Sequence, residues 1–244
     1  MIDLPEGVQR VIASLQAIGQ PSLPIFLDDQ ANSSQQVTET FGVDAGQIAI
    51  CTVFRRKSDD AVVLVITSSD RQLDDRKVKT LVCSDGGHVG RADAEFVQAK
   101  TGFSIEGVPP IAHVTAVVTL IDASLFRFSE VWAVAGHPQA VFKLTPQELK
   151  VLTGALVVDI VVSPEQAEAA RQQINILLAA RARTVSASGD KVLSPCISVC
   201  RINARTGLCE GCYRTLREIS GWSRSGSTAQ RMLWQLIEQR MADL

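Results

Sequence analysis

The sequence of 244 residues lacks any segment that could cross a membrane. Its longest apolar runs, residues 114–121 and 155–162, fall far short of the roughly 20 residues that a spanning helix needs. The N-terminal residues MIDLPEGVQRV also lack the basic segment and apolar stretch of a secretory leader. Aromatic residues make up only 5% of the chain, while the apolar fraction of 46% is that of an ordinary globular protein. These features predict a cytoplasmic protein with no membrane partner.

Cysteine is scarce until the C-terminal region. The first 195 residues contain only Cys51 and Cys83, and four cysteines then follow within 17 residues, spaced C-x3-C-x8-C-x2-C. Four thiolates can complete a tetrahedral zinc shell or hold an iron–sulfur cluster. Two disulfides are the alternative, and a metal is favoured because no leader is seen and cytosolic thiols stay reduced. The predicted ligands of this structural site are Cys196, Cys200, Cys209 and Cys212.

The net charge of −2 conceals an asymmetry. Residues 181–244 carry ten Lys or Arg against five Asp or Glu, which gives +5, and by difference residues 1–180 carry 14 against 21, which gives −7. A basic tail can contact the phosphates of a nucleic acid. The same arginines can equally offset the negative charge of a four-thiolate site, so the charge alone leaves both interpretations open.

Residues 1–162 alternate strand-like and helical patterns, which predicts one α/β domain around a mixed sheet. The clearest helix start is Thr145-Pro146-Gln147-Glu148, with Thr145 as N-cap and Glu148 completing a capping box. The predicted strands are residues 25–28, 47–54, 61–67, 113–120, 130–135, 140–144 and 155–162, and the predicted helices are residues 5–18, 36–41, 73–82, 92–100 and 146–153.

The remaining residues divide into a connecting segment and a small module. Residues 163–194 are predicted as a helix to about residue 183 followed by a flexible linker, because TVSASGDK at 184–191 is small and polar. Residues 195–244 form the predicted cysteine-rich metal module, with helices at 213–220 and 228–241. The overall prediction is an α/β domain followed by a small helical metal module.

Three segments in order, GQIAICTVF at 46–54, TGFSIEGVPPIAH at 101–113 and VWAVAGHPQAVFKLTPQEL at 131–149, resemble the YbaK/ProX family of aminoacyl-tRNA deacylases. The resemblance covers roughly residues 5–160. It implies a mixed α/β editing domain that hydrolyses the ester between a wrong amino acid and the 3′ end of tRNA, without a metal cofactor. Aminoacylated tRNA is then the expected partner, with an aminoacyl-tRNA synthetase as a possible associate.

The chemistry of ester hydrolysis suggests roles for the matching residues. Donors must lie where negative charge develops on the carbonyl oxygen, and glycines let backbone approach a ligand closely. Gly107 and His137 are therefore the catalytic candidates. The resemblance implies that the surrounding residues shape the substrate pocket, and the substrate-binding candidates are Ile50, Glu106, Val108, Pro110 and Gly136.

One departure from the family bears on activity. The family's strand usually carries a lysine where this sequence has Ile50, and losing such a charge-assisted contact would cost about 1.5–3 kcal/mol. Two functions therefore compete for residues 1–162: an active aminoacyl-tRNA deacylase, and a binding module that recognises aminoacyl-tRNA or an amino-acid-like ligand without hydrolysis. Restoring the lysine, Ile50→Lys, is expected to raise the activity of a weakened enzyme.

The C-terminal segments SPCISVC and GLCEGCYRTLREISGW resemble a small four-cysteine domain of unknown function that is labelled a predicted iron–sulfur protein. The resemblance implies an iron–sulfur cluster, whereas the spacing fits zinc equally well. Tyr213, Arg214, Glu218 and Trp222 recur in that pattern, and packing beneath the metal is the favoured role for them. A third functional hypothesis follows, in which this site senses iron or redox state.

Overall fold

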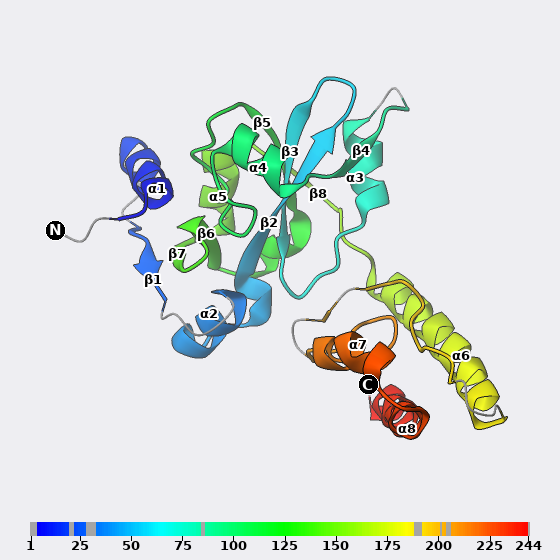
Figure 1. The fold of residues 1–244 in the computed structure, drawn as a ribbon. Helices are drawn as coiled ribbons and strands as arrows, with labels where there is room; N and C mark the ends of the chain where they lie inside the picture. The colour runs from blue at the N-terminus through cyan, green and yellow to red at the C-terminus, as the bar shows by residue number, and fades with distance from the viewer. Residues whose placement is uncertain are drawn as a thin grey trace. The chain divides into compact units, whose positions relative to one another are not determined.

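The computed structural model describes residues 4–19, 22–27, 33–83, 86–187, 192–200, 202–203 and 206–243, with the backbone alone at 33–36 and 186–187. The chain forms two compact units, Met1–Val162 and Ser163–Leu244, called the body and the tail unit below (Figure 1). None of the helices in these described ranges is long and apolar enough to span a bilayer.

The body is built on one mixed sheet, which confirms the predicted fold class. The described strands run in the order β1-β7-β6-β2-β3-β5-β8, and β4 also pairs with β2. The pairs β2–β3, β6–β7, β1–β7 and β2–β4 are antiparallel, and β2–β6, β3–β5 and β5–β8 are parallel. The strands are β1 (Ile25–Phe26), β2 (Ile48–Arg56), β3 (Ala61–Ser68), β4 (Val89–Arg91), β5 (Val117–Asp122), β6 (Val131–His137), β7 (Ala140–Leu144) and β8 (Leu156–Val158).

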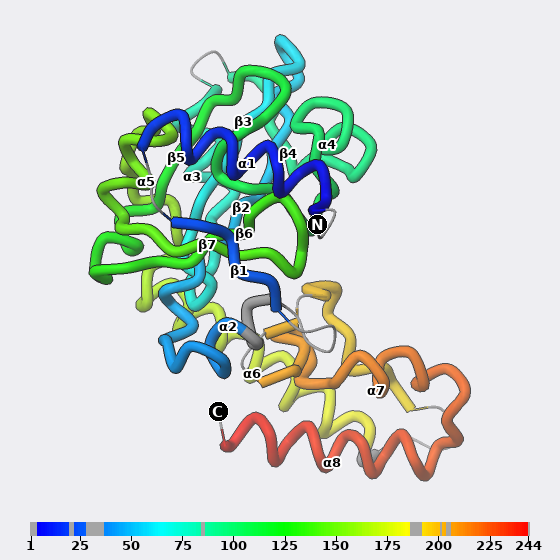
Figure 2. Tube along the Cα trace, turned by 90° about the vertical axis from the view of Figure 1, so that its left-hand side faces the viewer, coloured from blue at the N-terminus to red at the C-terminus, as the bar shows by residue number. Residues whose placement is uncertain are grey.

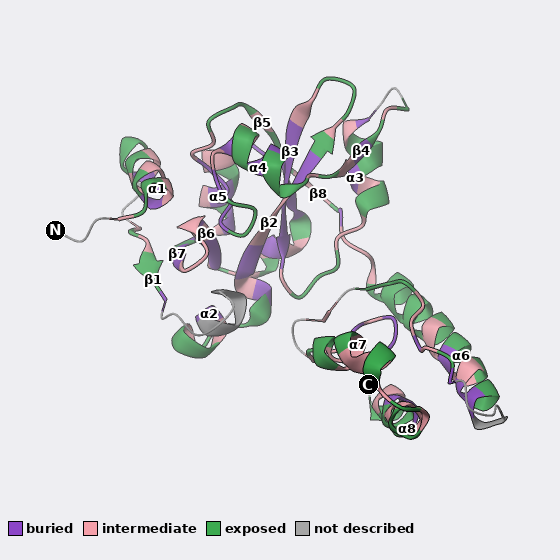
Figure 3. Cartoon of the chain, in the orientation of Figure 1, coloured by how far each residue is buried: buried purple, intermediate pink, exposed green. Residues whose placement is uncertain are grey.

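Helices cover both faces of this sheet, and the alternation of strand residues divides the core accordingly. On one face, Ala49 and Val53 of β2 belong to the main apolar cluster with residues of α1, α4 and α5. On the other face, Phe54 packs with α3, and Ile48 packs with α2. Figure 2 shows α1 in dark blue across the first face, and Figure 3 shows the buried central strands. The helices are α1 (Glu6–Ala17), α2 (Ser33–Phe41), α3 (Asp75–Val82), α4 (Ala94–Thr101) and α5 (Pro146–Thr153).

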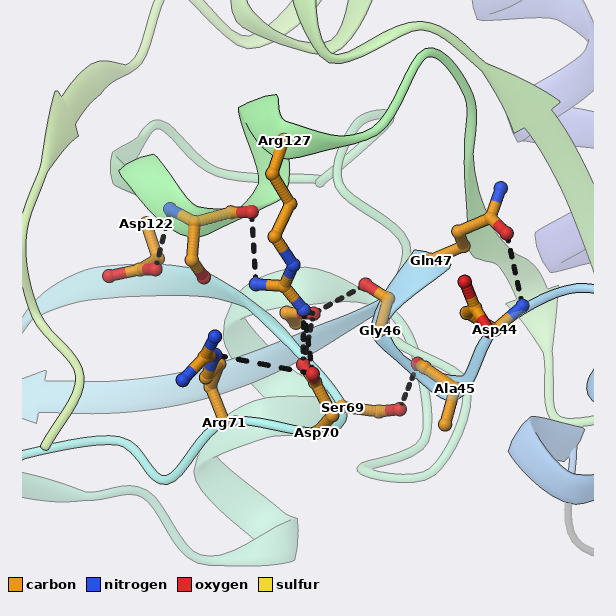
Figure 4. A network of polar contacts seen from close by, with 11 residues as sticks. Asp44, Ala45, Gly46, Gln47, Ser69, Asp70, Arg71, Asp122 and Arg127 are labelled. Atoms are coloured by element: carbon orange, nitrogen blue, oxygen red, sulfur yellow. Dashed lines mark hydrogen bonds and ion pairs between the residues drawn. The ribbon is translucent and has the colours of Figure 1, made fainter. Parts of the chain in front are cut away.

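A polar network ties the start of β2 to the end of β3 (Figure 4). Arg127, in a short 3-10 segment after β5, donates through Nη2 to both carboxylate oxygens of Asp70 at 2.6 and 2.7 Å. The buried Ser68 hydroxyl has two acceptors for its one proton, the Asp70 carboxylate at 2.7 Å and the carbonyl of Gly46. A side chain at Gly46 would collide with Arg127 and Phe128. This network holds the strand ends together.

Several predicted boundaries are wrong for identifiable local reasons. The strand predicted at 113–120 begins only at Val117, and the N–H of Val114 donates to the carbonyl of Thr101 instead. The strand predicted at 155–162 is reduced to β8 because the N–H of Ile160 donates to the Asp122 carboxylate at 3.0 Å. By contrast, α5 has the predicted N-cap and capping box at Thr145.

The described part of the tail unit has three helices, of which the first and the last pack around its own small core. Those helices are α6 (Pro164–Ala187), α7 (Leu216–Gly221) and α8 (Ser227–Asp243). The prediction of a flexible linker from residue 184 is wrong through residue 187, because α6 continues to Ala187; residues 188–191 lie outside the described ranges. The shared core contains Leu178, Ala182, Val185, Val192, Tyr213, Trp234 and Ile237. Since α6 supplies part of this core, it belongs with the cysteine module and does not merely connect it.

Candidate functional site

Two turns that are far apart in the sequence meet in the body. A Cβ atom placed on Gly107 would lie 3.3 Å from Cδ of Pro138 and 3.4 Å from Cα of His137. The first turn belongs to the loop after α4, and the second joins β6 to β7. The structure therefore brings the two catalytic candidates, Gly107 and His137, side by side.

The Gly107 loop is rigid around a single tight turn. The N–H of Gly107 donates to the carbonyl of Ser104 at 2.9 Å, so this N–H is not available to a substrate oxyanion. Residues 107–111 are buried, and Val108 is only 3% exposed within the main core cluster. Val108 and Pro110 thus anchor the loop, whereas Glu106 at the turn is exposed to solvent.

His137 presents a hydrogen-bond donor at this meeting point. Its Nδ1 accepts the N–H of Gln139 at 3.2 Å, so the neutral ring carries its proton on Nε2. The ring is half-buried, and the ring of Phe26 lies 6.3 Å away between centroids. Phe26 is 44% exposed, and sequence reasoning missed it; the only signal was an aromatic residue in a very short strand.

Gly136 serves packing. Its φ is +83°, and a Cβ atom there would lie 2.6 Å from the carbonyl oxygen of Gly7 in α1. The ring of Phe103 lies 2.9 Å from the same position. The close approach predicted for Gly136 is real, but its neighbour is helix α1 of the same chain.

His113 holds the Gly107 loop from its far end, and sequence reasoning did not single it out. Its Nε2 lies 2.8 Å from the carbonyl of Pro109 and must donate to it, since a carbonyl only accepts. Burial lowers the pKa of His113, and the nearby Arg10 charge lowers it further. Arg10 lies over the Phe103 ring at 4.2 Å and donates to the carbonyl of Gly102, so α1 supports this end of the loop as well.

The structure does not bring Ile50 to the same place. Ile50 is partly buried against the cluster that contains Ile48 and Trp132, whereas Val108 packs with the opposite face of β2. His137 pairs with Ala140, which also belongs to the cluster of Val108. The absent lysine is therefore separated by the sheet from the meeting point of the two turns.

Comparison with known proteins identifies the family of the segment that contains these two turns. Residues 28–152, just over half of the chain, match the family model described as "Aminoacyl-tRNA editing domain". The chain belongs to the aminoacyl-tRNA editing domain family. Two solved structures share 33% identity and a TM-score of 0.61, over 66% of this chain and 100% of their own: "a putative trans-editing enzyme for prolyl tRNA synthetase" and a protein from a study of epitope grafting onto scaffolds. A hypothetical protein shares 25% identity and a TM-score of 0.57, over 63% of this chain and 99% of its own. No curated protein matches the chain.

The body of this editing-domain protein is therefore an aminoacyl-tRNA deacylase, a hydrolase of the aminoacyl ester. Both turns lie inside the matched residues 28–152. Helix α1, which carries Gly7 and Arg10, and the exposed Phe26 precede them. The candidate site and the helix that packs against it thus include residues that precede the part of the chain covered by the family model.

The tail of the editing-domain protein matches a second family model over residues 194–241, described as "Protein of unknown function (DUF1289)". None of the six cysteines, all of which lie within the described ranges, forms a disulfide bond, so the structure gives no support to the alternative of two disulfides. Within the described residues no three His, Cys, Asp or Glu side chains are arranged to hold a metal ion. The pKa of Cys200 is nevertheless raised, chiefly by the charge of Cys196 and in part by that of Cys209, because these thiols lie near one another.

Two cysteine-bearing turns are packed directly together in this tail. A Cβ atom on Gly211 would lie 2.5 Å from Cβ of Val199, so the turn at 209–212 rests on the turn at 196–200. An antiparallel bridge also joins Ile202 to Cys209. Left-handed backbone at Cys200, φ +48°, and at Tyr213, φ +52°, ends each turn tightly. The fold therefore gathers both cysteine pairs in one place.

Proposed function

We propose that the body removes wrongly attached amino acids from tRNA in trans, in the cytoplasm, with His137 as the principal side-chain donor. Water attacks the ester carbonyl, the bond to the ribose oxygen breaks, and the free amino acid and the tRNA 3′ end are released. The Nε2–H of His137 donates to the oxygen on which negative charge develops. Its ring cannot also act as a base in this arrangement, because Nδ1 already accepts the N–H of Gln139.

The contact between Gly107 and His137 carries this proposal. A Cβ atom at Gly107 would already be in van der Waals contact with Cα of His137, so the two turns lie close enough for one substrate to touch both. Glu106, exposed on the same turn, is suited to bind the α-ammonium of the amino acid. Phe26 offers an exposed ring beside His137 on which the terminal base can stack.

The substrate we propose is tRNA for proline that carries a smaller amino acid. A structure at 33% identity is described as a putative trans-editing enzyme for prolyl tRNA synthetase. A synthetase pocket made for proline rejects a smaller amino acid by only about 1–3 kcal/mol per missing methylene, so such errors need editing. Association with that synthetase would place the deacylase where the errors arise.

The test is a deacylation assay on proline tRNA charged with alanine or with proline, beside an unrelated tRNA charged with alanine. We expect the purified full chain to hydrolyse the alanyl ester on proline tRNA fastest. Tight binding with no turnover on any substrate would instead establish the competing binding-module function. Turnover of correctly charged prolyl-tRNA at the same rate would reject the proposed substrate.

We further propose that the tail unit holds zinc or an iron–sulfur cluster through Cys196, Cys200, Cys209 and Cys212. The packing of the two cysteine turns through Gly211 and Val199 supports a shared site, and thiolates suit both metals. Metal analysis and absorption spectra after anaerobic purification would identify the metal, with Cys209→Ser and Cys212→Ser as controls. A brown chain that bleaches reversibly would favour the sensing function, whereas a colourless zinc protein would favour a structural one.

A further inference from the structure

The tail unit contains a buried cation. Arg214 is 2% exposed, although its guanidinium is charged at every physiological pH. Its Nε donates to Sγ of Cys212 at 3.3 Å, and its Cζ lies 5.3 Å from the centre of the Trp222 ring. Burying an arginine is costly unless a negative charge lies beside it.

The carboxylate that could supply this charge has other partners. Glu218 accepts the N–H of Thr215 at 2.8 Å and pairs with both Nη atoms of Arg240 at 2.8 and 3.0 Å. Within the described ranges, no carboxylate forms an ion pair with Arg214. The sulfur atom of Cys212 is the charge partner that remains in contact with the guanidinium.

The backbone of Arg214 is tied to the same turns. Its carbonyl accepts the N–H of Cys209 at 2.7 Å, so the residue contacts one cysteine through its backbone and another through its side chain. Four thiolates around a divalent cation leave a net charge of −2, which is itself costly to bury. A guanidinium in direct contact would reduce that charge and, by donating to sulfur, would orient one ligand.

We infer that Arg214 is the charge partner of a four-thiolate metal centre in the tail unit, and that it orients Cys212 by donating a hydrogen bond to its sulfur. This role rests on the metal site proposed above. It explains why an arginine, and not an apolar residue, fills a buried position between the second cysteine pair and Trp222. Arg214 is a positioning residue, since its guanidinium binds a ligand and not the metal.

The test compares three variants of the full chain: Arg214→Met, which removes the charge at similar volume, Arg214→Lys, which keeps it, and Arg217→Met as the control. Arg217 is exposed on α7 three residues away. Zinc affinity is measured by competition with a chromophoric chelator. Cobalt is then bound in place of zinc, and the energy of its thiolate-to-metal charge-transfer band is recorded.

We expect Arg214→Met to weaken zinc binding by roughly 10- to 100-fold, Arg214→Lys to recover much of it, and Arg217→Met to match the wild type. The cobalt band should move to lower energy in Arg214→Met, since a nearby cation stabilises the sulfur electrons. Wild-type affinity and band energy in Arg214→Met would overturn the inference, as would an equal loss in Arg214→Lys, which would show packing alone. If the wild type itself binds neither zinc nor cobalt, the proposed metal site is rejected, and this outcome is distinct from a failure of the role inferred for Arg214.

Discussion

Gly7 in α1 and Gly136 in β6 lie backbone against backbone. A Cβ atom on Gly136 would stand 2.6 Å from the carbonyl oxygen of Gly7 and 2.9 Å from the Phe103 ring. Gly136 directly precedes His137, and Phe103 opens the loop that leads to Gly107. The position of α1 is therefore coupled to both turns of the candidate site.

Gly136→Ala should destabilise the body strongly and reduce deacylation with it. The change places a side chain against α1 and forces an L residue into a left-handed conformation, with a cost of about 3 kcal/mol or more. Gly154→Ala is the matched control, because Gly154 has φ +61° and nothing within 4 Å of its Cβ position. That variant should lose roughly 1–2 kcal/mol for the backbone alone. Chemical denaturation measures the free energy of unfolding of both variants. An equal decrease in the two would show that the contact with Gly7 does not contribute to stability.

The stability of the body should depend on pH through His113. Its pKa is lowered in the folded state by burial and by Arg10, so the unfolded chain binds a proton first as the pH falls. Stability from this group is present above the unfolded pKa of about 6.5 and is lost progressively below it. His113→Gln should remove this part of the loss in thermal unfolding between pH 7 and 5. His88→Gln, at an exposed position, is the control, and identical pH profiles for the wild type and His113→Gln would contradict the assignment.

The structural roles of His113 and Gly136 could not be predicted from the sequence. Helix α5 was predicted to the residue because its capping box is local, and the central strands were predicted from their apolar, β-rich runs. That Gly107 and His137 meet came from the family resemblance. The use of the Gly107 N–H within its own turn, and the burial of Gly136 under α1, depend on contacts between distant segments. Such contacts leave no periodic or local signal in the chain.

His137→Ala should reduce kcat for deacylation by roughly 100-fold, the usual effect of removing one oxyanion donor. His137→Gln, whose amide can also donate, should recover part of the loss. The half-buried ring contributes little to the core, so thermal unfolding of both variants should stay near that of the wild type. An unchanged kcat in His137→Ala would show that His137 is not the oxyanion donor. A group in the Gly107 loop would then be the next candidate for that role.

Ile50→Lys should lower stability without raising turnover, contrary to the expectation from the family's lysine. The ammonium would enter the cluster around Trp132, on the face of β2 opposite Val108, at a cost of about 2 kcal/mol. Leu156→Lys in β8, where the side chain is 68% exposed, is the control and should be nearly neutral. A clear gain in deacylation by Ile50→Lys would mean that the substrate reaches the other face of the sheet.

Most arginines in the described part of the tail make internal contacts, and this bears on whether the basic tail contacts the phosphates of tRNA, which the charge pattern leaves open. Arg181 donates to the carbonyl of Cys196 at 2.6 Å, Arg231 to that of Val185 at 2.7 Å, and Arg240 pairs with Glu218. With Arg214 at Cys212, four of the tail's arginines are held by internal contacts, which leave the net charge of +5 unchanged but restrict the side chains that can reach a phosphate. Truncation after Thr184 would also cut through α6 and its core, so it cannot isolate the contribution of the tail to tRNA binding.

Replacing the exposed Arg183, Arg217 and Arg224 with alanine is the sharper test. If each contacts one phosphate, the slope of log affinity against log salt should decrease by roughly 0.7–0.9 per arginine, that is by about 2 to 3 overall. Arg76→Ala is the control, since that side chain in the body is 96% exposed. Binding of tRNA is measured by fluorescence anisotropy between low and physiological salt, with metal content checked in every variant. An unchanged slope in the triple variant would show that these arginines do not contact tRNA and would leave the exposed surface of the body as the site of phosphate contact.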